Sequence, residues 1–257
     1  MLPDRLILVH LHVGKTAGTA VNRALRSRFP QSQYLHVKGG RGRLDELNAR
    51  IEDGTIHKVK AVAGHIDYGM VSGIAKHCLC FSLFREPVAR ICSFFNFIHT
   101  TPHHKLHDQF KELRFDDLNK VATFVPHQIE RLGHQWASSS CRQLTGLHNA
   151  KATPFTHFWP MIEERLDSGR LVVGDVPHIS TFLGDNGVIN GPLPHVRKTD
   201  VDRFDDFVPA SPKTLTDAAR HYIEDLNAND VKLMEKLLER GHMRQPGTKP
   251  EPVQQKS

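Results

Sequence analysis

Short apolar runs along this chain alternate with segments whose apolar residues recur at helical spacing. The runs at Leu6–Val13, Tyr34–Val37, Lys58–Ala63, Cys78–Phe84 and Leu171–Gly174 are typical of strands. Because the Cys78–Phe84 run is apolar throughout, it predicts a strand buried on both faces of a parallel sheet.

Helical spacing follows two of these runs. After the first, Val21, Leu25 and Phe29 recur on one face. After Cys78–Phe84, Glu86 and Pro87 suit a helix start, and the apolar face that follows is Val88, Ile91, Phe95 and Ile98. Strands alternating with helices predict an α/β fold with a central, mainly parallel sheet flanked by helices.

The C-terminal part of the chain is predicted to contain two further helices and a tail. Ser211 and Pro212 suit an N-cap and a first turn, so we expect a helix from Ser211 to Leu226. A terminal helix at Val231–Leu238 is stopped by Gly241. Residues 1–243 are interpreted as one domain, and residues 244–257, which contain three prolines, as a disordered tail.

Composition narrows the class of partner. The 257 residues carry 34 Lys and Arg against 28 Asp and Glu, a formal net charge of +6, which favours anionic partners. No basic run interleaved with aromatic residues appears, so a nucleotide fits at least as well as nucleic acid. No apolar run is long enough to span a membrane, no signal segment is recognised and the four cysteines are unpatterned; the expected location is cytoplasmic.

The first segment with a chemical pattern is His12–Thr19, between a predicted strand and a predicted helix. Its Gly, Lys and Thr residues are typical of a loop that holds a phosphate with backbone N–H groups and a lysine. It is not a Walker A loop, because the first glycine of that motif would fall at Val9.

The second segment is Arg85–Ser93, where an arginine follows the buried strand and a serine lies eight residues later on the helix. Open α/β sheets bind ligands at the carboxyl ends of their strands, and the guanidinium fork suits a phosphate. Together the two segments resemble the signatures of the PAPS-dependent sulfotransferases, which transfer a sulfuryl group from 3′-phosphoadenosine 5′-phosphosulfate. Gly14, Ala20 and Glu86 depart from the usual family residues.

The resemblance implies a three-layer, P-loop-like fold and a set of binding residues. Residues Lys15, Thr16, Ala17, Gly18 and Thr19 would grip the 5′-phosphosulfate, with Lys15 stabilising the leaving group. Arg85 and Ser93 would bind the 3′-phosphate.

Three further stretches are similar to the carbohydrate branch that includes heparan sulfate 2-O-sulfotransferase. These stretches are Gly64–Gly69, Ser140–Gly146 and His195–Thr199. In the first, the resemblance implies that His65 is the catalytic base, and in the second that Arg142 binds the cofactor. Asp67 is the alternative base, or it orients His65. The implied reaction moves the sulfuryl group from PAPS to an acceptor hydroxyl, on a saccharide, with PAP as product and no metal required.

Several alternatives stay open at this point. A P-loop kinase is the second hypothesis, although the Cys78–Phe84 run ends in Arg85 and not in the acidic residue such an enzyme needs. A non-catalytic nucleotide-binding module is the third. The His103, His104 and His107 group indicates a solvated loop or acceptor contacts, not a metal site. The identity of the acceptor and the oligomeric state are undetermined.

Overall fold

The computed structural model of the chain describes residues 6–37, 41–104, 106–112, 117–120, 137–147, 153–189, 193 and 209–243. Its centre is a five-stranded sheet in the order β2-β3-β1-β4-β5, and every strand pair in it is parallel. The strands are β1 (Ile7–Leu11), β2 (Tyr34–Val37), β3 (Ala61–Gly64), β4 (Cys78–Phe84) and β5 (Leu171–Asp175). The expected α/β class and central parallel sheet are confirmed.

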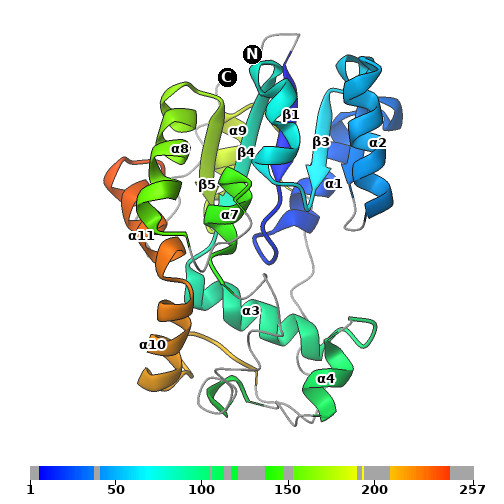
Figure 1. Cartoon of the computed structure of the whole chain (residues 1–257). Coiled ribbons are helices and arrows are strands. Elements are labelled where there is room, and N and C mark those ends of the chain that lie inside the picture. Colours follow the sequence, from blue (N-terminus) through cyan, green and yellow to red (C-terminus); the bar gives the residue numbers. More distant parts are fainter. Residues whose placement is uncertain are drawn as a thin grey trace, which may run out of the picture.

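Helices cover both faces of this sheet (Figure 1). One face packs residues of α1 (Gly18–Arg28) and α9 (Ile179–Asp185) against alternate strand residues such as Leu8 and Phe81. The opposite face, which includes Val9 and Cys80, packs on α2 (Arg41–Glu52), α7 (Ser139–Thr145), α8 (Phe155–Asp167) and α11 (Ala228–Glu239). This two-sided covering explains why the Cys78–Phe84 run is apolar throughout, since all seven of its residues are buried.

A third group of helices lies beyond the carboxyl ends of the strands. Helix α3 (Pro87–His99) runs across this end of the sheet, with α4 (His107–Glu112) and α10 (Asp217–Leu226) beside it (Figure 1). The predicted apolar face of α3 is fully buried and forms a second core with residues of α4 and α10. Helix α3 is therefore held by α4 and α10 near the end of the sheet at which ligands bind in open α/β folds.

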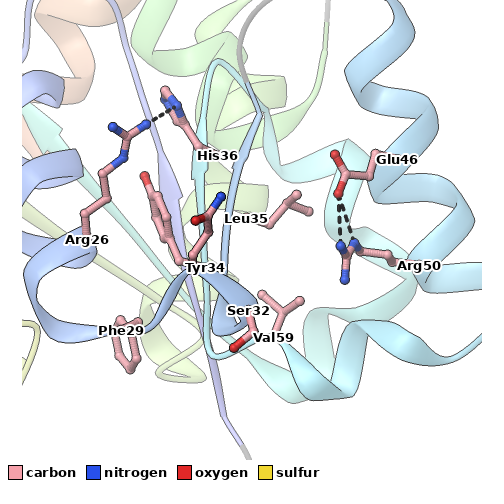
Figure 2. A pocket seen from close by; sticks show the side chains of 10 residues that line it. Arg26, Phe29, Ser32, Tyr34, Leu35, His36, Glu46, Arg50 and Val59 are labelled. Atoms are coloured by element: carbon pink, nitrogen blue, oxygen red, sulfur yellow. Dashed lines mark hydrogen bonds and ion pairs between the residues drawn. The ribbon is translucent and has the colours of Figure 1, made fainter.

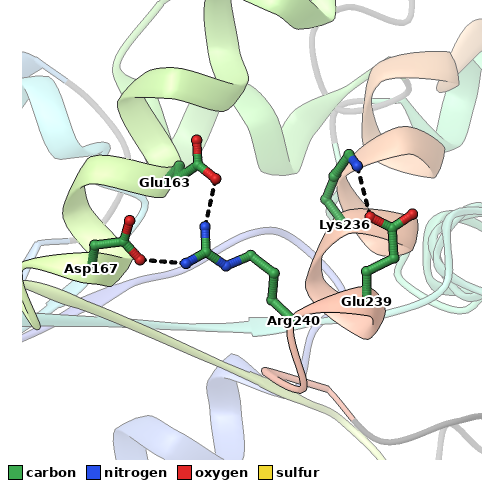
Figure 3. Close-up of polar contacts among 5 residues, drawn as sticks. All are labelled: Glu163, Asp167, Lys236, Glu239 and Arg240. Carbon is green, nitrogen blue, oxygen red and sulfur yellow. Dashed lines mark hydrogen bonds and ion pairs between the residues drawn. The ribbon is translucent and has the colours of Figure 1, made fainter.

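The described residues also include 3-10 segments: η1 (Gln31–Gln33), η2 (Thr55–Lys58) and η3 (Tyr68–His77). On the surface, Arg240 reaches Glu163 and Asp167 of α8 (Figure 3). Exposed ion pairs of this kind contribute little to stability, so the packing of α8 on α11 depends mainly on buried apolar residues such as Ile162 and Leu233.

One expected helix boundary is wrong. Helix α10 begins at Asp217 and not at Ser211, because the hydroxyl of Thr216 caps it by accepting from the Ala219 N–H at 3.2 Å. Ser211 instead closes a turn in which its carbonyl accepts from the Thr214 N–H. The predicted terminal helix is confirmed as α11, which is longer than expected.

Within the described ranges, no helix combines the length and apolar content that a membrane span requires.

Candidate functional site

The loops after β1 and β4 meet where the strand connections diverge. From β1 the chain leads toward β2 at one edge of the sheet, and from β4 toward β5 at the other edge. Such a switch point opens a crevice at the carboxyl ends of the strands. At this point an Arg85 Nη1–H donates to the Lys15 carbonyl oxygen at 3.4 Å. The two sequence segments are thus adjacent in space.

The loop between β1 and α1 has a conformation that few residues adopt. Lys15 and Ala17 have left-handed backbones, with φ of 70° and 61°. The hydroxyl of Thr16, fully buried, donates to the Val13 carbonyl oxygen at 2.8 Å. The Thr16 side chain therefore stabilises the loop. Its hydroxyl hydrogen is already used, so the donor that Thr16 can offer to a ligand is its backbone N–H.

The N-terminus of α1 is open. Ala17 occupies the N-cap position and has no side chain that can cap the helix. The first N–H groups of a helix have no partner within it, so those of Gly18 and Thr19 are directed out of the N-terminal end of α1. An uncapped N-terminus with a positive dipole end attracts anions.

Helix α3 provides the contrast. The carboxylate of Glu86 accepts from the N–H groups of Val88 and Ala89 at 2.8 and 2.6 Å, so this N-terminus is already satisfied. An anion bound beside α3 would consequently meet side chains. Phe97 of α3 lies under the Lys15 ammonium, 3.9 Å from ring centroid to Nζ. Ser93 precedes Phe97 by four residues and so lies on the same face of α3, one turn nearer its N-terminus.

Lys15 and Arg85 concentrate positive charge at this point. Burial, and then the charge of Arg85, lower the pKa of Lys15 to about 8. Within the part of the chain that the structure describes, no carboxylate forms an ion pair with either cation. Two partly buried cations beside an open helix N-terminus form a site whose charge an anion would neutralise.

His65 directly follows β3 and lies against His12. The two rings stack with centroids 4.4 Å apart, and His65 also bonds to the backbone of His12. Burial lowers the pKa of His65, and the bond to His12 only partly opposes this. At neutral pH the ring is therefore uncharged: one nitrogen donates its hydrogen to the His12 carbonyl, and the other keeps a lone pair that can accept a proton.

Two glycines permit this arrangement of histidines. A Cβ on Gly18 would lie 2.0 Å from His12 Nε2, so only glycine leaves room for that ring. A Cβ on Gly64 would lie 1.9 Å from the Val37 carbonyl oxygen, where φ is also +153°. The glycine in the Gly64–His65 pair is thus required by strand packing, whatever His65 does.

Arg142 lies in a different electrostatic setting. It is partly buried on α7, near the carboxylates of Asp230 and Asp67, which oppose the lowering of its pKa by burial. Asp67 itself caps η3 by accepting from the Met70 N–H at 3.2 Å. Arg142 has two acidic neighbours, whereas among the described residues the one carboxylate that acts on Arg85 is Glu86, which also caps α3.

Sequence reasoning missed one polar pair at this end of the sheet. The Asp175 carboxylate, at the end of β5, lies 2.7 Å from His178 Nδ1 and also accepts the His178 backbone N–H at 2.9 Å. Asp175 pairs in register with Phe84, the residue before Arg85. An acidic residue at the end of an apolar run, with a histidine three positions later, was the available signal.

Histidines of the predicted loop are engaged locally. His104 packs edge-on against Phe94 and Phe97, and His107 Nδ1 lies 2.9 Å from the Ile98 carbonyl oxygen. Across the described residues, no group of three or more His, Cys, Asp or Glu side chains is arranged to hold a metal ion.

No protein-family model matches this chain, and no curated protein matches it in sequence. The site is therefore defined by its own geometry: two adjacent cationic residues, Lys15 and Arg85, at the switch point of a parallel sheet in an α/β protein. The His195–Thr199 stretch and the 244–257 tail lie outside the described residues.

Proposed function

We propose that this chain is a PAPS-dependent sulfotransferase that sulfates a hydroxyl group, on a saccharide acceptor. One observation carries the proposal: Lys15 and Arg85, from sequence segments 70 residues apart, meet beside the uncapped N-terminus of α1. A nucleotide with phosphate groups at both its 5′ and 3′ positions offers one anion to each cation. The two motifs that resemble the sulfotransferase signatures contribute these same residues.

The reaction balances with the groups at hand. The acceptor oxygen attacks sulfur, and the bond from sulfur to the bridging oxygen of the 5′-phosphate breaks. That oxygen keeps the electron pair, and Lys15 with the N–H groups of Gly18 and Thr19 stabilises its charge. The acceptor proton passes to the lone pair of His65, giving a sulfate ester and PAP.

The test of cofactor binding compares PAP with 5′-AMP, which lacks the 3′-phosphate. Because hydrogen bonds to charged groups contribute about 1.5–3 kcal/mol, Arg85→Met should weaken PAP binding roughly 10- to 100-fold and 5′-AMP binding much less. Lys15→Met should weaken both and abolish transfer. Lys76→Met, an exposed lysine of η3, is the control for loss of one charge. Equal losses for PAP and 5′-AMP in Arg85→Met would contradict the assignment.

The test of catalysis uses His65→Gln, which keeps a polar side chain but cannot take up a proton. Sulfate transfer from PAPS to a panel of saccharides should fall by about 100-fold or more, while PAP binding remains. A thermal shift with ATP and Mg²⁺ that exceeds the shift with PAP would favour the kinase alternative. In that enzyme an acidic residue must lie near Lys15, whereas Asp175 lies two strands from β1 and contacts His178.

A further inference from the structure

A hollow lies against the edge strand β2, and neither Lys15 nor Arg85 is among its lining residues. It has a volume of about 590 Å³ and is bounded by the end of α1, η1, β2 and α2 (Figure 2). Strand β2 is the outermost strand on this side, two positions from β1. The volume of the hollow is within the range of small-molecule sites.

The lining combines an apolar floor with charged walls. Leu35 and Val59 are buried at its base. Arg26 lies on the α1 side, and Arg50 lies on the α2 side, where Glu46 pairs with it at 3.0 Å (Figure 2). Two guanidinium groups and one carboxylate leave a net charge of +1. The remaining wall residues are Phe29, Gln31, Ser32, Tyr34 and His36.

A hydrogen-bond network orients the α1 wall. Arg26 Nη2 lies 3.3 Å from His36 Nδ1, and the Asn22 amide lies 3.0 Å from His36 Nε2. An arginine can only donate, so His36 Nδ1 accepts from Arg26. The Tyr34 hydroxyl donates to Asn22 Oδ1 at 3.5 Å, which is long for a hydrogen bond between two oxygens.

These contacts decide what Tyr34 offers. Its oxygen accepts from Arg26, whose side chain bonds to the hydroxyl, and its hydrogen is engaged only in the long contact with Asn22. Because that contact is long, the hydroxyl hydrogen is free to turn to a ligand in the hollow that Tyr34 lines. Arg26 and Tyr34 together present a charged donor and a neutral donor on one wall.

We propose that this hollow binds an acidic sugar, a hydroxylated six-membered ring that bears a carboxylate or sulfate group. The oxyanion binds to Arg26 and to the Tyr34 hydroxyl, and the apolar face of the ring covers Phe29. Glu46 and Ser32 bond to sugar hydroxyls. The choice of a sugar rests on the proposed function, in which this hollow holds a unit of the acceptor remote from the hydroxyl that is sulfated.

Calorimetric titration of the full chain tests this with four probes: glucuronic acid, glucose 6-sulfate, glucose and inorganic sulfate. The two acidic sugars should bind, and glucose and sulfate should each bind at least about tenfold more weakly. Tyr34→Phe removes one hydrogen bond and should weaken glucuronic acid about 5- to 10-fold, and Arg26→Met about 10- to 100-fold. Arg23→Met, an exposed arginine on the same helix outside the lining, is the matched control.

Each outcome has a defined meaning. No binding of either acidic sugar, or equal losses in Arg26→Met and Arg23→Met, would overturn the site. If inorganic sulfate binds as tightly as the acidic sugars, the proposal of a sugar ligand is overturned and the hollow is a simple oxyanion site. PAP binding should be unchanged in Tyr34→Phe. Failure of PAP to bind the unmodified chain would overturn the proposed function alone, because the titration with sugars needs neither PAP nor turnover.

Discussion

At the residue scale, the site depends on a few positions with very little space. The His12 ring fits between Gly18 and His65 only because Gly18 has no side chain. Nearby, Lys15 and Ala17 hold left-handed backbones that cost roughly 1–2 kcal/mol each. Backbone strain concentrated in one loop points to a functional constraint on that loop.

Gly18→Ala should disrupt the histidine pair. The new Cβ would overlap the His12 ring, and relief of such overpacking typically costs about 1–3 kcal/mol. We expect a lower free energy of unfolding in a denaturant titration and a loss of sulfate transfer. Gly14→Ala is the control, because a Cβ there meets nothing within 4 Å. Equal stability of the two variants would show that the His12 ring is not held as described.

The pH dependence of kcat/KM for PAPS should be asymmetric. His65 acts as a base only when neutral, and burial lowers its pKa below the ordinary 6.5, so the decline of activity in acid is centred below pH 6.5. Lys15 must be protonated to bind an anion, and its pKa is about 8, so kcat/KM falls as pH rises through 8. Kinetics between pH 5 and pH 10 in a constant-ionic-strength buffer measures both limbs. An acid limb centred at or above 6.5 would argue against His65 as the base.

At the scale of elements, two helices that begin at the same edge of the sheet differ in their N-termini. The start of α3 is satisfied by its own carboxylate, Glu86, whereas α1 starts at an alanine and has no side-chain cap. This difference leaves α1 as the helix available to an external anion.

Ala17→Asp should separate stability from binding. A carboxylate at the start of α1 takes the place of a ligand anion and pairs with the helix dipole and Lys15, so thermal stability should be kept or raised. Affinity for PAP should fall about 10- to 100-fold, as in the loss of a charge-assisted contact. Ala17→Asn has the same shape without the charge and should bind PAP more tightly than Ala17→Asp. Equal affinities would mean that the α1 terminus does not meet the anion.

At the scale of the whole molecule, a buried polar network holds α3 against the C-terminal helices. Arg90 is 1% exposed, and its Nη2 donates to Asn227 Oδ1 at 3.0 Å. The Asp230 carboxylate, near Arg90, accepts the backbone N–H groups of Ser140 and Cys141 at 3.0 and 2.9 Å. These residues link α3, α7 and α11, although they are far apart in sequence.

Asp230→Asn should destabilise the whole chain. The substitution leaves the buried charge of Arg90 without its compensating carboxylate and removes an acceptor at the start of α7, a loss of about 3–5 kcal/mol. Urea unfolding followed by circular dichroism measures the change. Asp225→Asn, exposed on α10, should alter stability by less than about 0.5 kcal/mol. A change in Asp230→Asn as small as this would show that the network contributes little.

The strands, α1, α3 and the terminal helix could all be predicted because apolar periodicity is a local property of the chain. Lys15 and Arg85 could be predicted as candidates because a strand-to-helix loop and a strand end are also local patterns. The start of α10 could not, since Ser211 and Thr216 both satisfy the local rule for an N-cap, and the turn at Ser211–Thr214 selects the second.

What the sequence alone determined is the alternation of strands and helices and the residue types with chemical potential. Tertiary structure decided their neighbours: that Lys15 lies on Phe97 and beside Arg85, that Arg142 lies among carboxylates, and that His65 stacks on His12. Local patterns depend on residues a few positions apart, whereas the charge, burial and hydrogen bonds of a side chain depend on atoms that folding brings from distant parts of the chain.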